Sequence, residues 1–287
     1  MLQDYPGDSL QRVQAVQVEI MDIVAAICDE FDLTWFVDSG TCLGAVRHGG
    51  FIPWDDDIDL SLPLDDYRTF CRVAPEVLAG SGYGIYLPIV TENYPPLFAK
   101  VYKEGTRFIG EQMLDAGFDE GIFVDVFAYA QLDSDPRKAK RQADSLTFWH
   151  RMSFLYHLAH PYLPPSMPFS SLVGAGLVAV HHAVRAVLSP TEIERRFWDV
   201  LESGDGKGPW TDVFYADWGT YPTEVLFPTA MLAFGDGEVP APHDPDAFLT
   251  TLYGDYMQVP PESERCMKPP LVLDFGDGVN VIEGAVA

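Results

Sequence analysis

Between Pro53 and Pro63, residues 57–60 alternate carboxylates with apolar side chains. Asp57 and Asp59 are separated by Ile58, and Leu60 follows. Successive side chains of a strand point to opposite faces of its sheet. The pattern therefore predicts a strand whose two carboxylates share one face while Ile58 and Leu60 enter a core. Such a strand requires a sheet with one buried face and one face that carries a polar site.

Two neighbouring carboxylates repel each other unless a cation neutralises them. Hard divalent cations, Mg²⁺ above all, prefer such oxygen ligands. A glycine turn, Ser39-Gly40-Thr41, precedes the strand, and glycine lets backbone N–H groups come close to a phosphate. A carboxylate-held metal beside such a turn is suited to phosphate chemistry. The alternatives are a solvated acidic loop and an ordinary tight turn.

Residues 35–59 read WFVDSGTCLGAVRHGGFIPWDDDID. This stretch closely resembles the signature of the LicD family, which includes bacterial phosphocholine transferases and the fukutin-related transferases of animals. Residues 98–106, 121–127 and 252–261 resemble further blocks of the family, so the likeness runs from about Trp35 to Arg265. The family often has an Arg followed by His residues after the last block, whereas residues 264–268 here read ERCMK. The resemblance implies a nucleotidyltransferase-like core.

The resemblance also implies the residues of the site. Asp57, Asp59 and Asp125 would be catalytic and would hold the metal, Mg²⁺ or Mn²⁺. The residues expected to bind the donor and its phosphates are Ser39, Gly40, Thr41, Arg47, His48 and Lys100. Asp125 lies in an otherwise apolar strand, where a buried charge must be paired or face a site. It would either ligate metal or accept a proton, unless it forms a structural salt bridge.

Other residues permit two interpretations each. Asp55 and Asp56 either orient the metal ligands or occupy an exposed turn, and Trp54 either stacks on a ligand or packs in that turn. Three histidines of a predicted helix, His150, His157 and His160, are interpreted as ordinary helix-face residues rather than zinc ligands. The aromatic residues that either form a cage for a quaternary ammonium group or pack in the core are Trp210, Trp218, Tyr221 and Tyr253.

The composition argues against several classes of function and location. The 287 residues carry a net charge of −25, which argues against non-specific nucleic-acid binding. The four cysteines have no CxxC spacing and indicate reduced thiols in a cytosolic protein. Residues 1–10 have no signal-peptide pattern, and the apolar residues 171–180 are too few to span a bilayer. We expect a cytoplasmic protein, working at the inner face of the membrane if its acceptor is lipid-linked.

The periodicity predicts an α+β fold: a nucleotidyltransferase-like mixed sheet flanked by helices, with an added helical region and an irregular C-terminal wrap. The expected parts are a catalytic core over 1–135, a helical region over 136–205 and a segment over 206–287 that returns to the catalytic face. Helices are expected at 9–30, from 44, and at 65–72, 137–160, 172–188 and 191–201, and strands at 34–37, 58–62, 83–87, 98–102 and 122–127. Residues 167–188 form either a buried helix or a helix that contacts a membrane peripherally.

The resemblance implies a Mg²⁺-dependent phosphotransferase. It would move a phospho-alcohol, phosphocholine first among them, from a CDP-activated donor to a hydroxyl of a cell-surface polysaccharide, teichoic acid or lipid-linked precursor, and release CMP. The alternatives are transfer from CDP-ribitol or CDP-glycerol, a nucleotidyltransferase that moves NMP and releases pyrophosphate, and a non-catalytic scaffold.

Overall fold

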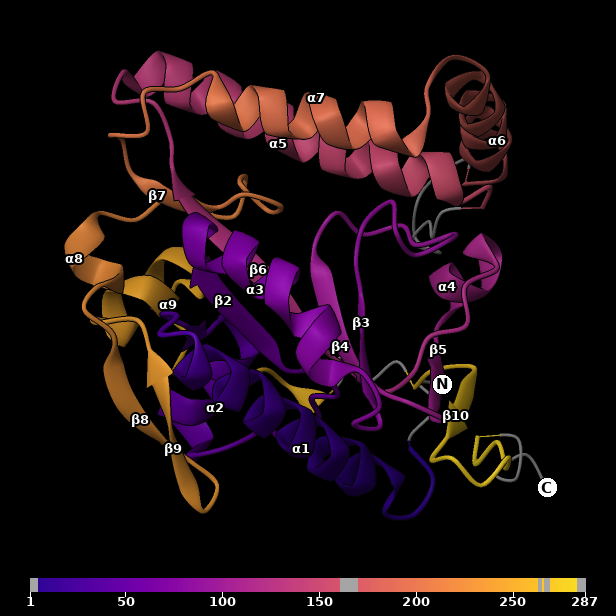
Figure 1. The fold of residues 1–287 in the computed structure, drawn as a ribbon, viewed down its shortest axis with the longest axis vertical. Coiled ribbons are helices and arrows are strands. Elements are labelled where there is room, and N and C mark those ends of the chain that lie inside the picture. Colours follow the sequence, from indigo (N-terminus) through magenta and orange to yellow (C-terminus); the bar gives the residue numbers. More distant parts are fainter. Residues whose placement is uncertain (1–4, 161–169, 263–264, 266–268, 283–287) are drawn as a thin grey trace.

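The computed structural model describes residues 5–160, 170–262, 265 and 269–282. A central sheet lies between helices, with a second group of helices along one end of the molecule (Figure 1). The helices are α1 (Ser9–Glu30), α2 (Ser39–His48), α3 (Leu64–Leu78), α4 (Glu111–Ala116), α5 (Pro136–His157), α6 (Ser170–Val187), α7 (Pro190–Glu202), α8 (Thr223–Leu226) and α9 (Pro245–Tyr253). The strands are β1 (Phe36–Val37), β2 (Asp59–Pro63), β3 (Tyr83–Tyr86), β4 (Ala99–Lys103), β5 (Arg107–Ile109), β6 (Phe123–Gln131), β7 (Trp210–Asp212), β8 (Ala230–Phe234), β9 (Gly237–Ala241) and β10 (Val272–Asp274).

The central sheet is mixed. Its strand order is β1-β2-β6-β4-β3, and β7 pairs with the second half of β6. The pair β2–β6 is parallel, with Asp59 opposite Asp125, while the other pairs are antiparallel. Lys100 of β4 faces Asp125 from the other side. The register therefore brings three predicted site residues into one row across neighbouring strands, with their side chains on one face.

Helices α1 and α3 pack on the sheet, and their apolar stripes face the strands. The core between them includes Ile58 and Leu60, which are fully buried as the alternation predicts. Helices α5 and α7 pack on each other, and α6 packs on α5, to form a helical layer at the top of Figure 1. One apolar core cluster extends through all three parts of the chain and includes Leu146 and Phe248.

Residues 206–287 add a hairpin next to α2 and β1 and a strand that pairs with β5. The hairpin β8–β9 packs against α2 and β1, and α9 also packs on α2. Strand β10 pairs with β5 in a separate two-stranded sheet. The 206–287 segment is thus less irregular than expected, because its strands are only three to five residues long and β9 contains a glycine and a proline that conceal the alternation.

The α+β class with a mixed sheet is confirmed, and two local predictions are wrong. Ser39 and Gly40 do not form a tight turn; they begin α2, which starts at Ser39 rather than near Gly44. The helix expected to end at Arg72 continues through Pro75 to Leu78. Buried Ala74 and Leu78 provide packing contacts on either side of the proline, and these outweigh the loss of one backbone hydrogen bond.

Candidate active site

Three consecutive carboxylates gather in the loop before β2. Within the described ranges, Asp55, Asp56 and Asp57 are the acidic, histidine or cysteine side chains whose ligand oxygens come within 4.8 Å of one another. The predicted metal set of Asp57, Asp59 and Asp125 shares one member with this group. Asp55 and Asp56 are half-buried rather than exposed, which favours the first of their two interpretations.

Helix α1 holds the backbone of this loop. The Gln14 side-chain amide donates to the Asp55 carbonyl at 2.9 Å, and the Gln17 amide donates to the Asp56 carbonyl at 2.6 Å. The hydroxyl of Tyr5 donates to the Asp56 carboxylate at 2.5 Å. These contacts fix the loop that presents the carboxylates. The sequence alone does not reveal these contacts, because a glutamine on an amphipathic helix gives no signal of its partner.

The carboxylates of the loop and sheet repel one another. Burial, and then the charge of Asp57, raises the pKa of Asp55 to about 8, and burial raises the pKa of Asp56 to about 6. Burial and the charge of Asp125 raise the pKa of Asp57. The pKa of Asp59 is raised well above its usual value by burial and by Asp57. The four groups therefore form one acidic cluster in which each negative charge disfavours the others.

The cluster suits a divalent cation. In the part of the chain that the structure describes, no Lys or Arg forms an ion pair with Asp55, Asp56, Asp57 or Asp59. Half-buried carboxylates without a cationic partner are costly. Hard carboxylate oxygens are the ligands that Mg²⁺ and Mn²⁺ prefer. The donor set thus fits the metal that the sequence predicts.

Lys100 belongs to a buried ion-pair network beside this cluster. Its Nζ lies 3.0 Å from Glu120 Oε1 and 3.3 Å from Asp125 Oδ1. It also lies 3.3 Å from the centre of the Phe123 ring. Lys100 is near enough to Asp57 to lower the pKa of that carboxyl, against the larger effect of burial. Asp125 therefore has a cationic partner, and its pKa is raised only to about 6, with burial as the main cause.

The start of α2 supports the carboxylate loop. The Asp38 side chain caps the helix by accepting from the Ser39 N–H at 2.6 Å, and Thr41 Oγ1 accepts from the Asp59 N–H at 2.9 Å. A Cβ on Gly40 would lie 2.9 Å from the Asp55 carboxylate. The glycine thus permits Asp55 to lie directly over the helix end. Ser39 and Thr41 are buried, and the hydroxyl of Thr41 is occupied by the strand backbone.

Arg47 and His48 lie at the other end of α2. Arg47 Nη1 donates to the Tyr256 carbonyl at 2.7 Å, which joins the helix to the C-terminal segment. His48 is exposed, and its ring meets the Trp54 ring edge-to-face at 6.1 Å. The guanidinium of Arg265 lies 4.5 Å from the centre of Trp54. These contacts place the two residues at a junction with the C-terminal segment, and their role toward a donor remains a prediction. Glu264 and residues 266–268 of the run ERCMK lie outside the described residues.

Aromatic side chains lie beside the carboxylates. Tyr215 and Trp218 stack with ring centres 4.3 Å apart, and Trp218 is 51% exposed. Burial and the charges of nearby carboxylates, Asp125 first, raise the pKa of Tyr215. Tyr253 is 45% exposed, and burial and the charge of Asp59 raise its pKa. Of the four predicted cage residues, Trp218 and Tyr253 are exposed, whereas Tyr221 is buried and Trp210 bonds to Thr223.

The histidines of α5 are held by protein contacts. His150 Nδ1 lies 2.8 Å from the Phe214 carbonyl, and His157 Nδ1 lies 2.8 Å from the Ser153 carbonyl. His160, just after the helix, pairs with Asp115 at 2.9 Å. The three therefore have separate partners.

Two buried acidic residues beside the site, Glu120 and Asp38, were not predicted from the sequence. Glu120 pairs with Lys100, and Asp38 caps α2 while it accepts from the hydroxyls of Ser61 and Tyr129. Neither lies in an alternating pattern. Asp38 could have been found from the helix-capping rule applied to the Asp-Ser pair before an apolar run.

Comparison with known proteins agrees with this arrangement. The family model "LicD/FKTN/FKRP, nucleotidyltransferase domain" matches residues 32–94, which contain the carboxylate loop and α2. The lipopolysaccharide cholinephosphotransferase LicD of Haemophilus influenzae is 26% identical over 271 residues, which cover 90% of this chain and 94% of that protein. The human ribitol 5-phosphate transferase FKRP is 40% identical over 43 residues, 15% of this chain and 9% of that protein. An uncharacterised protein of Rickettsia prowazekii is 40% identical over 99 residues, 33% of this chain and 36% of that protein. The chain is therefore similar to the LicD family over most of its length and is a LicD-like phosphotransferase.

Proposed function

We propose that this enzyme transfers phosphocholine from a CDP-activated donor to a hydroxyl of a cell-surface glycan or its lipid-linked precursor, and releases CMP. The observation that carries the proposal is the cluster of Asp55, Asp56, Asp57 and Asp59, which has no protein cation among the described residues. Such a cluster fits a metal that binds a pyrophosphate. Relatives named for phosphocholine and ribitol phosphate transfer support the same reaction class.

The protein would hold Mg²⁺ through Asp57 and Asp59, with Asp55 or Asp125 as a further ligand. When bound there, such an ion would neutralise the charge that develops on the leaving CMP. Gln14 and Gln17 keep the loop in place, so that its carboxylates need little reorganisation when the donor arrives. Arg47 and Lys100 are the basic residues proposed to hold the donor phosphates. Lys100 would do so while it remains paired with Asp125.

The transfer step follows from this arrangement. The acceptor hydroxyl oxygen attacks the phosphorus next to the alcohol and forms a new P–O bond. The bond between that phosphorus and the bridging oxygen breaks, and CMP leaves with the electron pair. The hydroxyl proton passes to a base, for which Asp125 is the candidate where Asp55 rather than Asp125 completes the metal site.

The aromatic side chains favour choline over ribitol as the alcohol. A quaternary ammonium group is attracted to the faces of Trp and Tyr rings. Trp218 presents its exposed ring while stacked on Tyr215, and Tyr253 is also accessible. The acidic cluster nearby adds further attraction for a cation. A polyol such as ribitol would gain no comparable benefit from these rings.

The test is a donor panel. The enzyme is incubated with Mg²⁺ and CDP-choline, CDP-ribitol, CDP-glycerol or CTP, with and without glycan acceptors, and CMP and pyrophosphate are measured. We expect acceptor-dependent CMP release from CDP-choline and its loss with EDTA. Asp57→Ala and Asp59→Ala should lower turnover by at least about a hundredfold, because each removes a metal ligand.

The matched control is Asp65→Ala, which removes an exposed carboxylate at the start of α3. It should keep normal turnover. Near-normal turnover of either site variant in saturating Mg²⁺ would contradict the site. Release of pyrophosphate from a nucleoside triphosphate instead of CMP would make the enzyme a nucleotidyltransferase. Preference for CDP-ribitol would contradict the choline assignment, and no transfer from any donor would favour a scaffold.

A further inference from the structure

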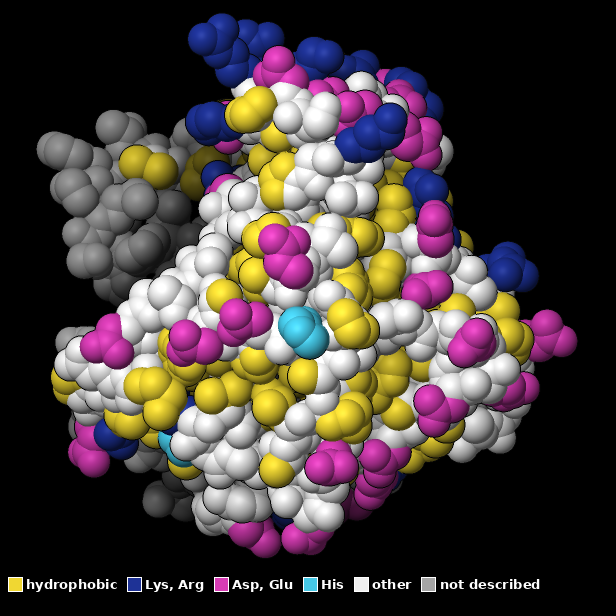
Figure 2. Space-filling view, turned by 90° about the vertical axis from the view of Figure 1, so that its left-hand side faces the viewer, with side chains coloured by type: hydrophobic (Ala, Val, Ile, Leu, Met, Phe, Trp, Pro, Cys, Tyr) yellow, Lys and Arg dark blue, Asp and Glu magenta, His cyan; other side chains and the backbone are white. Residues whose placement is uncertain are grey.

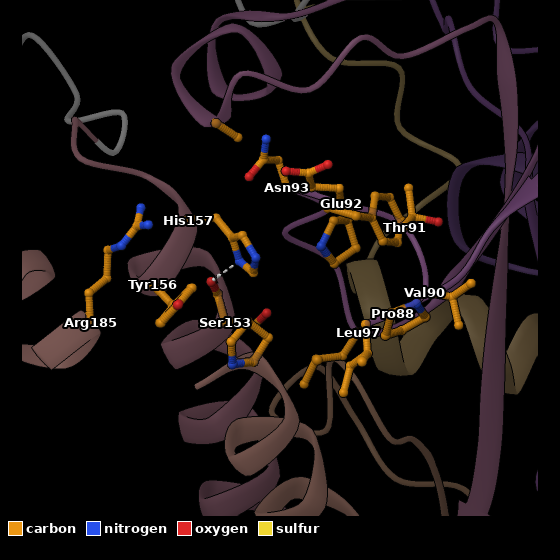
Figure 3. Close-up of a pocket in the computed structure, with 15 residues that line it drawn as sticks. Pro88, Val90, Thr91, Glu92, Asn93, Leu97, Ser153, Tyr156, His157 and Arg185 are labelled. Atoms are coloured by element: carbon orange, nitrogen blue, oxygen red, sulfur yellow. Dashed lines mark hydrogen bonds between the residues drawn. The ribbon is translucent and has the colours of Figure 1, made fainter. Parts of the chain in front are cut away.

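A polar cavity lies between the loop of residues 88–97 and the helical layer. It has a volume of about 290 Å³ and is bounded by that loop, by the last turns of α5 and by α6 (Figure 3). Its described lining includes none of the residues assigned above to the transfer reaction. The cavity is therefore a candidate binding site in its own right.

The loop that forms one wall is held in place by hydrogen bonds. The Ser153 hydroxyl of α5 donates to the Pro95 carbonyl at 2.7 Å. Thr91 Oγ1 accepts from the Leu87 N–H, and the Thr91 N–H donates to the Leu87 carbonyl, each at 3.0 Å. This wall is formed before a ligand arrives, which reduces the entropy that binding would cost.

The same loop carries backbone strain. Ile89 has a φ of +64° and Asn93 a φ of +57°, so both lie in the left-handed region. A β-branched residue such as isoleucine is an outlier there. Ile89 is also 42% exposed, so burial of its side chain offsets only part of the strain. Strained residues cluster at active sites and ligand clamps, which indicates that the shape of this loop serves a ligand.

Helix α6 is docked on α5, which fixes Arg185 at the cavity. His181 and Val184 are buried, and His181 Nδ1 lies 2.9 Å from the Leu155 carbonyl. Val180 on another side of α6 is exposed, so the helix expected at 167–188 is only partly buried, and its contact with a membrane stays a prediction. Among the described residues, no helix combines the length and apolar character needed to cross a membrane.

Polar atoms reach the cavity from both walls. His157 Nδ1 lies 2.8 Å from the Ser153 carbonyl and must donate to it, so Nε2 keeps a lone pair for a ligand. Burial lowers the pKa of His157, which keeps the ring neutral near pH 7. Glu92 and Asn93 lie on the loop side, across from His157 (Figure 3). The cavity therefore offers hydrogen-bond acceptors on both sides and an amide donor on the loop.

The charges around the cavity balance. Arg185 and Glu92 are its charged residues among the described lining, and the Arg185 guanidinium lies 5.1 Å from the centre of the Tyr156 ring. A free anion would meet the Glu92 carboxylate, and a free cation would meet Arg185. An uncharged ligand rich in hydroxyl groups can accept from Arg185 and Asn93. The same hydroxyl groups can donate to Glu92 and to the His157 lone pair.

The cavity shares a wall with the buried network of the sheet. Tyr94 lines the cavity, and its hydroxyl donates at 3.0 Å to the Phe98 carbonyl, two residues before Lys100. Burial, and then the charges of Asp125 and Glu120, raise the pKa of Tyr94. The cavity therefore lies behind Tyr94 as seen from Asp125. A group bound in it would be next to the reaction site without occupying the place of the metal or the donor.

We propose that this cavity is a subsite for a sugar residue of the acceptor, held apart from the hydroxyl that receives the transferred phosphate group. A neutral sugar carries hydroxyl groups around its ring, which fits a balanced lining with donors and acceptors on opposite walls. Binding away from the reacting atoms would hold the acceptor in position for attack. The inference rests on the proposed transfer to a glycan but not on the alcohol that the donor carries.

The first test measures sugar binding without any donor. Saturation-transfer NMR is recorded on the full chain with glucose, galactose, N-acetylglucosamine, N-acetylgalactosamine and, as a charged probe, phosphocholine. We expect saturation transfer to at least one sugar. Glu92→Ala/Asn93→Gly on the loop and Arg185→Met on α6 should each weaken it at least about threefold, because polar partners are lost. Glycine at position 93 tolerates the left-handed backbone.

The matched control is Asp236→Ala/Glu238→Ala, which removes two exposed carboxylates from the β8–β9 hairpin. It should bind sugar like the wild type, and circular dichroism should show that all variants are folded. The second test is acceptor kinetics. Both cavity variants should raise KM for the glycan acceptor at least about threefold while kcat and the donor KM stay unchanged, which a merely structural role would not produce.

Three results overturn the proposal. They are no saturation transfer to any of the four sugars, equal transfer in the wild type and both cavity variants, and an unchanged acceptor KM in variants that have lost sugar binding. Saturation transfer to phosphocholine but to no sugar would make the cavity a site for a zwitterion instead. Because the NMR test contains no donor, its result is independent of whether CDP-choline is the substrate, so failure of the two proposals can be told apart.

Discussion

At the residue scale, Lys100 Nζ lies between two buried carboxylates, 3.0 Å from Glu120 and 3.3 Å from Asp125. Burial alone would lower the pKa of Lys100, but these carboxylates raise it overall, so the side chain stays protonated. Each member of the network depends on the others. Lys100 keeps Asp125 close to its ordinary charge state, and it adds positive potential beside the acidic cluster.

We predict that Lys100→Met destabilises the fold by about 3–5 kcal/mol, because it leaves two buried carboxylates without a partner. Glu120→Gln in the same chain should recover part of this loss, since one buried charge is then removed. The free energy of unfolding of the wild type, both single variants and the double variant gives the coupling between the two sites. A coupling near zero would show that Lys100 does not depend on Glu120.

The same cycle bears on catalysis. If Lys100 also contacts a donor phosphate, the double variant Lys100→Met/Glu120→Gln should transfer phosphocholine slowly even where its free energy of unfolding has recovered. Glu120→Gln alone should retain more activity than any Lys100 variant, because it keeps the cation next to Asp125.

At the scale of elements, β2 was predictable because its polar and apolar residues alternate, and β6 because it is an almost continuous apolar run. Their pairing was not, since no local pattern of Asp59 specifies its neighbour across the sheet. The register that puts Asp59, Asp125 and Lys100 in one row is set by long-range packing. Gly40 misled the prediction for α2, since glycine signals a turn but here makes room for Asp55. Glu120 was missed because an acid beside Gly121 looks like an ordinary loop residue.

The contact between α5 and the 213–215 segment gives a pH prediction at this scale. His150 of α5 is buried against Phe98 and Phe214, and burial lowers its pKa to about 4, against 6.5 for an exposed histidine. Between pH 6.5 and 4 the unfolded chain therefore binds more protons at this site than the folded chain. The folded state should accordingly lose stability as the pH falls through this window.

We expect the lowered pKa of His150 to reduce the free energy of unfolding by up to about 3 kcal/mol at pH 4 relative to pH 7. His150→Gln keeps a donor for the Phe214 carbonyl but cannot be protonated. Urea unfolding at several pH values between 7 and 4 should show a gap between wild type and variant that changes by this amount. If the free energies of unfolding of wild type and variant changed with pH in parallel, His150 could not be a neutral, buried histidine.

At the scale of the whole molecule, charge is divided unequally. Residues 136–205 carry a formal charge of +2, against −27 for the rest of the chain, and Lys and Arg side chains gather at the top of the view in Figure 2. The acidic part would oppose the approach of the negatively charged donor in the proposed reaction, and a cation bound in the cluster would reverse the local potential. Metal binding, proton release and fold stability should therefore be coupled.

The last prediction follows from this coupling. Because folding raises the pKa of Asp55 to about 8 and of Asp56 to about 6, from 3.8 in the unfolded chain, the metal-free protein should lose stability as the pH rises from about 4 through about 8. Mg²⁺ competes with those protons and binds better once they have left. The increase in Tm caused by Mg²⁺ should accordingly be larger at pH 8.5 than at pH 6. NaCl at matched ionic strength should not reproduce it, and Asp57→Asn should abolish most of it. If Mg²⁺ raised the Tm equally at both pH values, its binding would not compete with protons on Asp55 and Asp56, and the metal site would have to lie elsewhere.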